Sequence, residues 1–141
     1  GKVDAIIMFD VLLHQVAPNW DEIINLYSNN TRYFIIYNPQ YIGPTTVRLI
    51  NLGEDEYFKN VPHNRDEEPY KSFIEKMYEL HPYHNKIYKD IHNVWQWGIV
   101  DNDLVKVMKE NGFEKTYYVN YGQWGELKKF EGHAFIFERL D

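Results

Sequence analysis

The stretch that decides the fold is VDAIIMFDVLLHQVAPNWDEIINLYSNNTRYFIIYN, residues 3–38. An apolar run from Val3 to Phe9 opens it, and a second run from Tyr33 to Tyr37 closes it. Runs that are apolar at nearly every position are typical of strands covered on both faces in a parallel sheet. The stretch therefore predicts a buried strand, a short polar turn, a helix and a second parallel strand.

The helix expected between these strands covers residues 18–29. Pro18 or Asn19 suits its start, and Asp21 and Glu22 suit the positive first turn. A connection of this kind joins two parallel strands as a crossover.

The last part of the chain predicts a helix and a strand pair. Asp101 is expected to cap the helix, which ends at Asn111 and Gly112. Lys115–Tyr121 and His133–Arg139 predict two antiparallel strands that close the sheet. The loop between them is expected to hold three glycines, Gly122, Gly125 and Gly132.

The middle of the chain has a looser pattern. Residues 39–100 are interpreted as an insertion within a single domain that spans residues 1–141. Pro69–Leu80 carries apolar residues at helical spacing, and we expect this stripe to pack against the core. The domain is thus expected to be α/β, with a helical insertion.

Composition excludes several classes of protein. The chain has 141 residues, 44% of them hydrophobic, and lacks a long uncharged apolar run, so it predicts one globular domain that does not span a membrane. The net charge of −6 disfavours nucleic acid as a partner. The absence of cysteine excludes disulfides and thiolate sites, and we expect a cytoplasmic location.

Two motifs carry a resemblance to a known family. VDAIIMFDVLLHQV, followed by a helix and RYFIIYNPQ, resembles the fourth and fifth strands of class I S-adenosylmethionine-dependent methyltransferases. NDLVKVMKENGF and GHAFIFERL resemble the last helix and closing hairpin of the family. The resemblance implies the carboxyl-terminal half of a Rossmann-like methyltransferase sheet, because the glycine-rich cofactor loop that follows the family's first strand is absent.

The resemblance also implies roles for three residues. Phe9 and Asp10 match positions that border the methionine end of S-adenosylmethionine, the cofactor expected for the intact enzyme. His14 follows closely and is a candidate general base for a small-molecule methyl acceptor. The alternative is structural: Asp10 caps the turn, and His14 is a satisfied buried polar group.

The insertion contains a dense cluster of histidine and aromatic residues. Three interpretations are open: a metal site, a substrate cap over the carboxyl edge of the sheet, and ordinary core packing. We favour the cap over a metal site, since the histidine spacing matches no common closed site and Pro82 interrupts any single helix. The candidate substrate-binding residues are Asn38, Gln40, Tyr41, His81, His84, His92, Trp95 and Trp97.

Residues Val3 to Phe9 are also expected to form an edge strand that needs covering. We expect either self-association or a missing amino-terminal half to cover it. Two functions follow from this. The first is the substrate-side portion of a small-molecule methyltransferase, and the alternative is a non-catalytic binding or assembly module that keeps the scaffold without cofactor binding.

Overall fold

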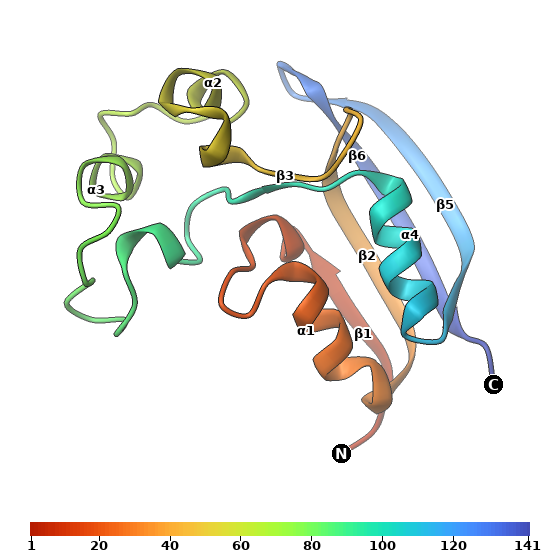
Figure 1. Ribbon diagram of the computed structural model, residues 1–141. Helices are drawn as coiled ribbons and strands as arrows, with labels where there is room; N and C mark the ends of the chain where they lie inside the picture. Colours follow the sequence, from red (N-terminus) through yellow and green to blue (C-terminus); the bar gives the residue numbers. More distant parts are fainter.

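The computed structural model describes all 141 residues. Its main sheet has four strands in the order β1-β2-β6-β5, of which β1 and β2 are parallel and the other neighbours antiparallel (Figure 1). The strand bounds are β1 Val3–Phe9, β2 Thr31–Tyr41, β5 Phe113–Trp124 and β6 Leu127–Arg139. This mixed sheet, with its two layers of structure, confirms the predicted α/β class.

The first helix, α1, spans Trp20–Tyr27 and connects the parallel strands as predicted. Its start is fixed by the backbone N–H of Asn19, which donates to the Glu22 carboxylate over 3.0 Å. This bond is half of a capping box and satisfies a backbone donor that the helix leaves free. A short 3-10 turn, Ser28–Asn30, then leads into β2.

The last helix, α4, spans Asp101–Glu110 and ends at Asn111 and Gly112, where φ is +88°. The prediction that Asp101 caps it is wrong. Val100 is the N-cap and Asp101 is the first helical residue, because its carboxylate bonds to side chains of the sheet instead of the helix backbone.

The closing hairpin is confirmed, but its loop is shorter than predicted. Trp124 pairs with Leu127, so Gly125 is the glycine of the turn. Gly122 and Gly132 lie inside β5 and β6, because the pairing of the two strands continues past both.

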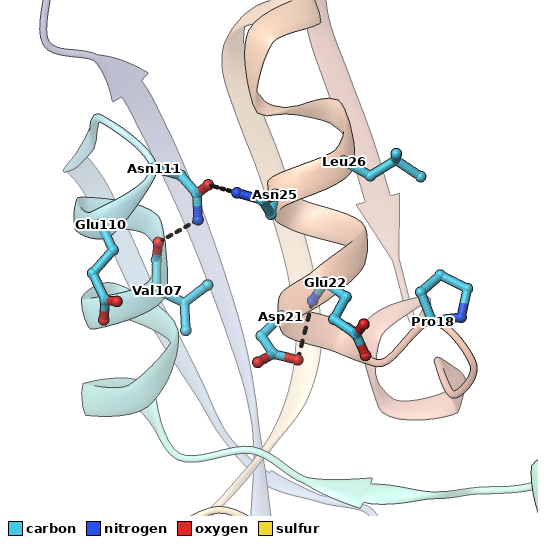
Figure 2. A pocket seen from close by; sticks show the side chains of 8 residues that line it. All are labelled: Pro18, Asp21, Glu22, Asn25, Leu26, Val107, Glu110 and Asn111. Atoms are coloured by element: carbon cyan, nitrogen blue, oxygen red, sulfur yellow. Dashed lines mark hydrogen bonds between the residues drawn. The ribbon is translucent and has the colours of Figure 1, made fainter.

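Helices α1 and α4 lie side by side on one face of the sheet (Figure 1). Asn25 Nδ2 donates to Asn111 Oδ1 over 2.8 Å and joins the two helices at an acidic surface groove (Figure 2). Beneath them is a core of 12 buried residues. These are Met8, Leu12, Trp20, Ile24, Phe34, Ile36, Ile99, Leu104, Met108, Phe113, Phe135 and Phe137.

The first three residues of the predicted insertion, Pro39–Tyr41, are the end of strand β2. The remainder of residues 39–100 follows from that strand. It holds a two-stranded sheet and two short helices that extend to one side of the main sheet (Figure 1). Their bounds are β3 Val47–Arg48, β4 Trp97–Gly98, α2 Glu54–Lys59 and α3 Tyr70–Glu75. Helix α3 is shorter than the predicted Pro69–Leu80, because the carbonyls of Met77 and Glu79 accept bonds from the backbone N–H groups of Lys89 and Tyr88.

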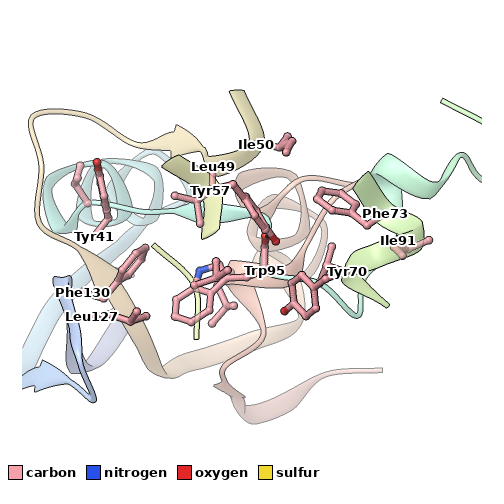
Figure 3. Close-up of a cluster of buried hydrophobic side chains, with 14 residues drawn as sticks. Tyr41, Leu49, Ile50, Tyr57, Tyr70, Phe73, Ile91, Trp95, Leu127 and Phe130 are labelled. Atoms are coloured by element: carbon pink, nitrogen blue, oxygen red, sulfur yellow. Dashed lines mark hydrogen bonds between the residues drawn. The ribbon is translucent and has the colours of Figure 1, made fainter. Parts of the chain in front are cut away.

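A second core of 14 buried residues fills the insertion (Figure 3). Tyr57 and Phe73 lie at its centre, and Tyr41 from β2 and Phe130 from β6 join it to the main sheet. Strand β2 therefore contributes to both cores, with Phe34 and Ile36 in one and Tyr41 in the other.

The opposite face of the main sheet is apolar and open. A hollow of about 450 Å³ there is lined entirely by hydrophobic residues of the strands and of the end of β1. Phe9 is 63% exposed and Tyr121 is 64% exposed in this hollow. Strand β1 is an edge strand, as predicted, but the prediction that it is buried on both faces is wrong: Met8 is its only buried residue, and Ile7 is 62% exposed, because no strand pairs with its outer edge and no helix covers the open face. None of the helices is long and apolar enough to cross a membrane.

Candidate functional site

The chain turns sharply where β1 ends. Asp10 has a positive φ of 56°, and its backbone N–H donates to Tyr37 O over 3.0 Å. This bond places the turn beside the end of β2, at the sheet edge where ligands of open α/β sheets bind. Partial burial raises the pKa of the Asp10 carboxyl, and the nearby His14 offsets part of that rise.

His14 ends the 3-10 turn Leu12–His14 and faces the insertion. Its Nδ1 lies 2.7 Å from Val94 O, and only a protonated ring nitrogen can donate to a carbonyl. Burial lowers the pKa of His14, so the ring is neutral at pH 7 with its proton on Nδ1. Nε2 makes no hydrogen bond to the protein, which leaves its lone pair free to accept a proton.

Asp10 and His14 define what we term the β1-loop site. Two further bonds hold this loop to the insertion: Gln96 N–H donates to Leu13 O over 2.9 Å, and Trp97 Nε1 donates to Gln15 O over 2.8 Å. The insertion thus fixes the position of the loop from one side.

The predicted residues at the end of β2 are buried. Asn38 Nδ2 donates to Gln40 Oε1 over 2.7 Å, and Gln40 Nε2 donates to Asp101 Oδ1 over 3.0 Å. Asn38 Oδ1 is buried without a partner. Tyr41 packs on Phe130, with ring centroids 5.4 Å apart. All three side chains are buried, and their role in substrate binding stays a prediction.

The hydrogen bonds from Asn38 through Gln40 to Asp101 continue to His133, a residue that the sequence analysis did not identify. His133, 3% exposed, donates from Nδ1 to Asp101 Oδ1 over 2.9 Å and from Nε2 to Glu131 Oε1 over 3.0 Å. Tyr118 OH donates to Asp101 Oδ2 over 3.0 Å. We term this group the Asp101–His133 network, and its members are Asn38, Gln40, Asp101, Tyr118, Glu131 and His133.

Asp101 and His133 stabilise each other's charged forms through their hydrogen bond. Burial alone would raise the pKa of Asp101, but the hydrogen bonds from His133 and Gln40 outweigh it and lower that pKa. Burial raises the pKa of Tyr118 to about 12, helped by the Asp101 charge, so its hydroxyl remains a donor at neutral pH. One signal could have shown the network: His133 alternates with Phe135 and Phe137, which predicts that it points inward.

The histidines of the insertion do not form one centre. The rings of His81 and His84 are tilted by 39° with centroids 4.3 Å apart, whereas His92 Nε2 bonds to Val16 O over 2.6 Å. No group of three or more His, Cys, Asp or Glu side chains is placed to hold a metal ion. A polar pocket of about 380 Å³ brings together His84 and His92.

The two tryptophans have different positions. Trp95 is 3% exposed and packs on Phe130 with ring centroids 4.9 Å apart, which places it in the core of the insertion. Trp97 is half-buried in β4 and holds the β1 loop through its indole nitrogen. Phe9 points its ring toward Tyr37 on the open face. A role in ligand binding stays a prediction for each of these residues.

No protein-family model matches the chain, and no curated protein matches it in sequence. Solved structures do match in fold. A magnesium protoporphyrin IX methyltransferase from Synechocystis PCC 6803, solved with bound SAH, shares 16% identity at a TM-score of 0.50 and aligns over 99% of this chain. A SAM-dependent methyltransferase from Methanosarcina mazei shares 16% identity at a TM-score of 0.51, also over 99% of this chain.

The aligned part is only a portion of each of these proteins. This chain spans 46% of the first and 60% of the second. At this identity the likeness shows the fold alone, and the chain has part of a Rossmann-like fold similar to that of these methyltransferases.

Proposed function

We propose that this chain is the carboxyl-terminal, substrate-side portion of an S-adenosylmethionine-dependent methyltransferase that acts on a small-molecule acceptor. The observation that carries the proposal is the alignment of 99% of the chain with part of two such methyltransferases. The strand order β1-β2-β6-β5, with its parallel first pair and antiparallel closing pair, supports the carboxyl-terminal assignment.

The β1-loop site fits the amino-acid end of the cofactor. The Asp10 carboxyl lies at the exposed end of β1, where partial burial raises its pKa and His14 offsets only part of that rise. A neighbouring ammonium group would offset the remainder. The cofactor supplies an electrophilic methyl group, and Phe9 would border its methionine end.

His14 is proposed as the general base for a hydroxyl acceptor. Its fixed tautomer and free Nε2 are the properties that such a base needs, and its lowered pKa keeps the ring neutral at pH 7. Methyl transfer also depends on alignment of the acceptor with the methyl group, so positioning by the loop carries part of the catalysis. The insertion, residues 39–100, is proposed as the cap that selects the acceptor, and the cytoplasm as the location.

The edge of β1 and the open face need a covering layer in this proposal. The solved methyltransferases are longer than this chain, and a preceding part of a longer polypeptide is the proposed cover. A second copy of the chain is the alternative.

A non-catalytic assembly module is the second candidate function. The observation that favours it is the combination of an unpaired edge strand with an entirely apolar hollow on the open face. Such surfaces are typical of protein interfaces.

Calorimetric titration separates the two functions. S-adenosylmethionine and its demethylated product are added to this chain and to the full-length polypeptide. Binding by the full-length polypeptide supports the methyltransferase, and absence of binding from both supports the assembly module. In an active enzyme, His14→Gln should lower kcat by about 10²-fold for a hydroxyl acceptor, with cofactor affinity unchanged.

A further inference from the structure

A polar pocket of about 380 Å³ lies in the insertion next to the β1 loop. It is lined by six residues, of which one is hydrophobic: His84, Lys86, Asp90, Ile91, His92 and Asn93. Five of the six lining residues are polar, and His84, His92 and Asn93 are exposed, so a ligand bound here would be held by charge and hydrogen bonds and not by apolar burial.

Two bonds join this pocket to the loop that follows His14. Lys86 Nζ donates to Ala17 O over 3.2 Å, and His92 Nε2 lies 2.6 Å from Val16 O. A third bond, from His14 Nδ1 to Val94 O, comes two residues after His92 in the insertion. The pocket and the proposed base are thus held by the same stretch of loop, residues 14–17.

The hydrogen bonds leave donors of the pocket without partners. His92 Nε2 must carry a proton, since a carbonyl can only accept. Lys86 Nζ lies 3.2 Å from that same nitrogen, and two donors cannot bond to each other. The ammonium therefore has one protein acceptor, Ala17 O, for its three protons. Nδ1 of His92 makes no bond to the protein.

The charge of Lys86 is also without a partner. Asp90 is the only carboxylate of the lining, and its Oδ1 lies 3.0 Å from Arg48 Nη2 in an ion pair. Lys86 forms no ion pair, because no carboxylate oxygen lies within 4.0 Å of its Nζ. The pocket carries a surplus of positive charge and of hydrogen-bond donors.

We propose that this pocket, centred on Lys86 and His92, is a subsite for a small anionic group, a carboxylate or a phosphate, on the ligand of the insertion. The ammonium supplies charge, the side chains of His84 and Asn93 supply hydrogen bonds, and His92, whose Nε2 proton is donated to Val16 O, holds the subsite to the β1 loop. Its further identification as the site for the anionic group of the methyl acceptor rests on the proposed function. Anion binding itself does not.

The test is a titration followed by the backbone amide signals of the full-length protein in nuclear magnetic resonance. The probes are inorganic phosphate, benzoate and the neutral benzamide, at constant ionic strength to hold screening fixed. We expect saturable shifts at residues 84–93 in the millimolar range with phosphate, benzoate or both, and none with benzamide. Preference for phosphate identifies a phosphorylated ligand, and preference for benzoate a carboxylated one.

Variants separate the subsite from general surface charge. Lys86→Met should weaken anion binding about 10-fold, and Lys86→Arg should retain most of it. Lys89→Met is the matched control, because Lys89 lies over the Tyr78 ring, 5.5 Å from its centroid, and does not line the pocket. Equal loss in both methionine variants, equal shifts with benzamide, or no saturable shift would overturn the proposal.

This outcome is independent of the cofactor titration described above. Anion binding without S-adenosylmethionine binding leaves the subsite standing and removes the methyltransferase. Cofactor binding without anion binding supports the methyltransferase and removes the subsite.

Discussion

His133 Nδ1 lies 2.9 Å from Asp101 Oδ1, although 32 positions separate the two residues in the chain. The other ring nitrogen, Nε2, lies 3.0 Å from Glu131 Oε1. Both nitrogens face carboxylate oxygens, so each must carry a proton to donate these bonds. The geometry requires the imidazolium form and places a buried positive charge between α4 and the closing hairpin.

The stability of the fold should depend on pH through this ring. Burial alone would lower the pKa of His133, but the bonds to Asp101 and Glu131 raise it above 6.5. The stabilisation is therefore fully present below 6.5, the unfolded value, and is lost as pH rises through the folded pKa. Urea unfolding should show a lower free energy of unfolding at about pH 9 than at about pH 6.

His133→Gln should abolish this difference between the two pH values, because a neutral amide does not titrate. The carboxylates of Asp101 and Glu131 affect the free energy of unfolding at acidic pH instead. The pKa values of Asp101 and Glu131 are lowered, so their stabilisation is lost as pH falls through the folded values. A variant that kept the full alkaline decrease would show that another group causes it.

The core beneath the helices should be sensitive to loss of volume. Phe34 is fully buried in β2 and packs edge-to-face on Phe113, with ring centroids 5.0 Å apart. Phe34→Ala should lower the free energy of unfolding by about 3–5 kcal/mol. Tyr83→Ala, at a side chain that is 88% exposed, should change it by less than about 0.5 kcal/mol. Similar small effects in both variants would contradict the core assignment.

Two glycines should respond differently to a methyl group. At Gly98 an added Cβ would lie 2.8 Å from Tyr41 Cγ, the fixed end of a buried ring, so Gly98→Ala should cost about 1–3 kcal/mol. At Gly132 the added Cβ would meet the hydroxyl end of Tyr37, which can move aside. Thermal unfolding should show a clearly larger loss for Gly98→Ala than for Gly132→Ala, and the reverse order would refute the contact.

Association should depend on the edge strand. Ile7→Lys places a charge at a position that is 62% exposed on β1, and it should reduce self-association or binding of a covering segment while leaving the unfolding transition in place. Leu26→Lys, at an equally exposed aliphatic position on α1, is the matched control. Analytical ultracentrifugation measures the outcome. An unchanged mass in Ile7→Lys would argue that β1 is not an interface.

Local sequence patterns predicted the framework well. The apolar runs that became β1 and β2, the start of α1 at Asn19 and the glycine that ends α4 are all specified by neighbouring residues, so they could be identified without tertiary information. The same holds for the pairing of β5 with β6.

Long-range contacts account for what the sequence did not predict. Helix α2 has six residues and no regular apolar stripe. Helix α3 ends early because Tyr88 and Lys89 bond to the carbonyls of Glu79 and Met77, in the segment that follows it. The Asp101–His133 network depends on four elements that meet only in the folded chain. Asp101 matched the pattern of a helix cap, and only the position of His133 shows its actual role.

Strand β2 belongs to both hydrophobic cores and is paired on each side. Neither core can open without exposing part of this strand, so the insertion and the helical layer should unfold as one cooperative unit. The amides of β2 should therefore exchange with solvent most slowly. A ligand that binds only to the insertion should also slow exchange beneath α1 and α4, at a distance from its own contacts.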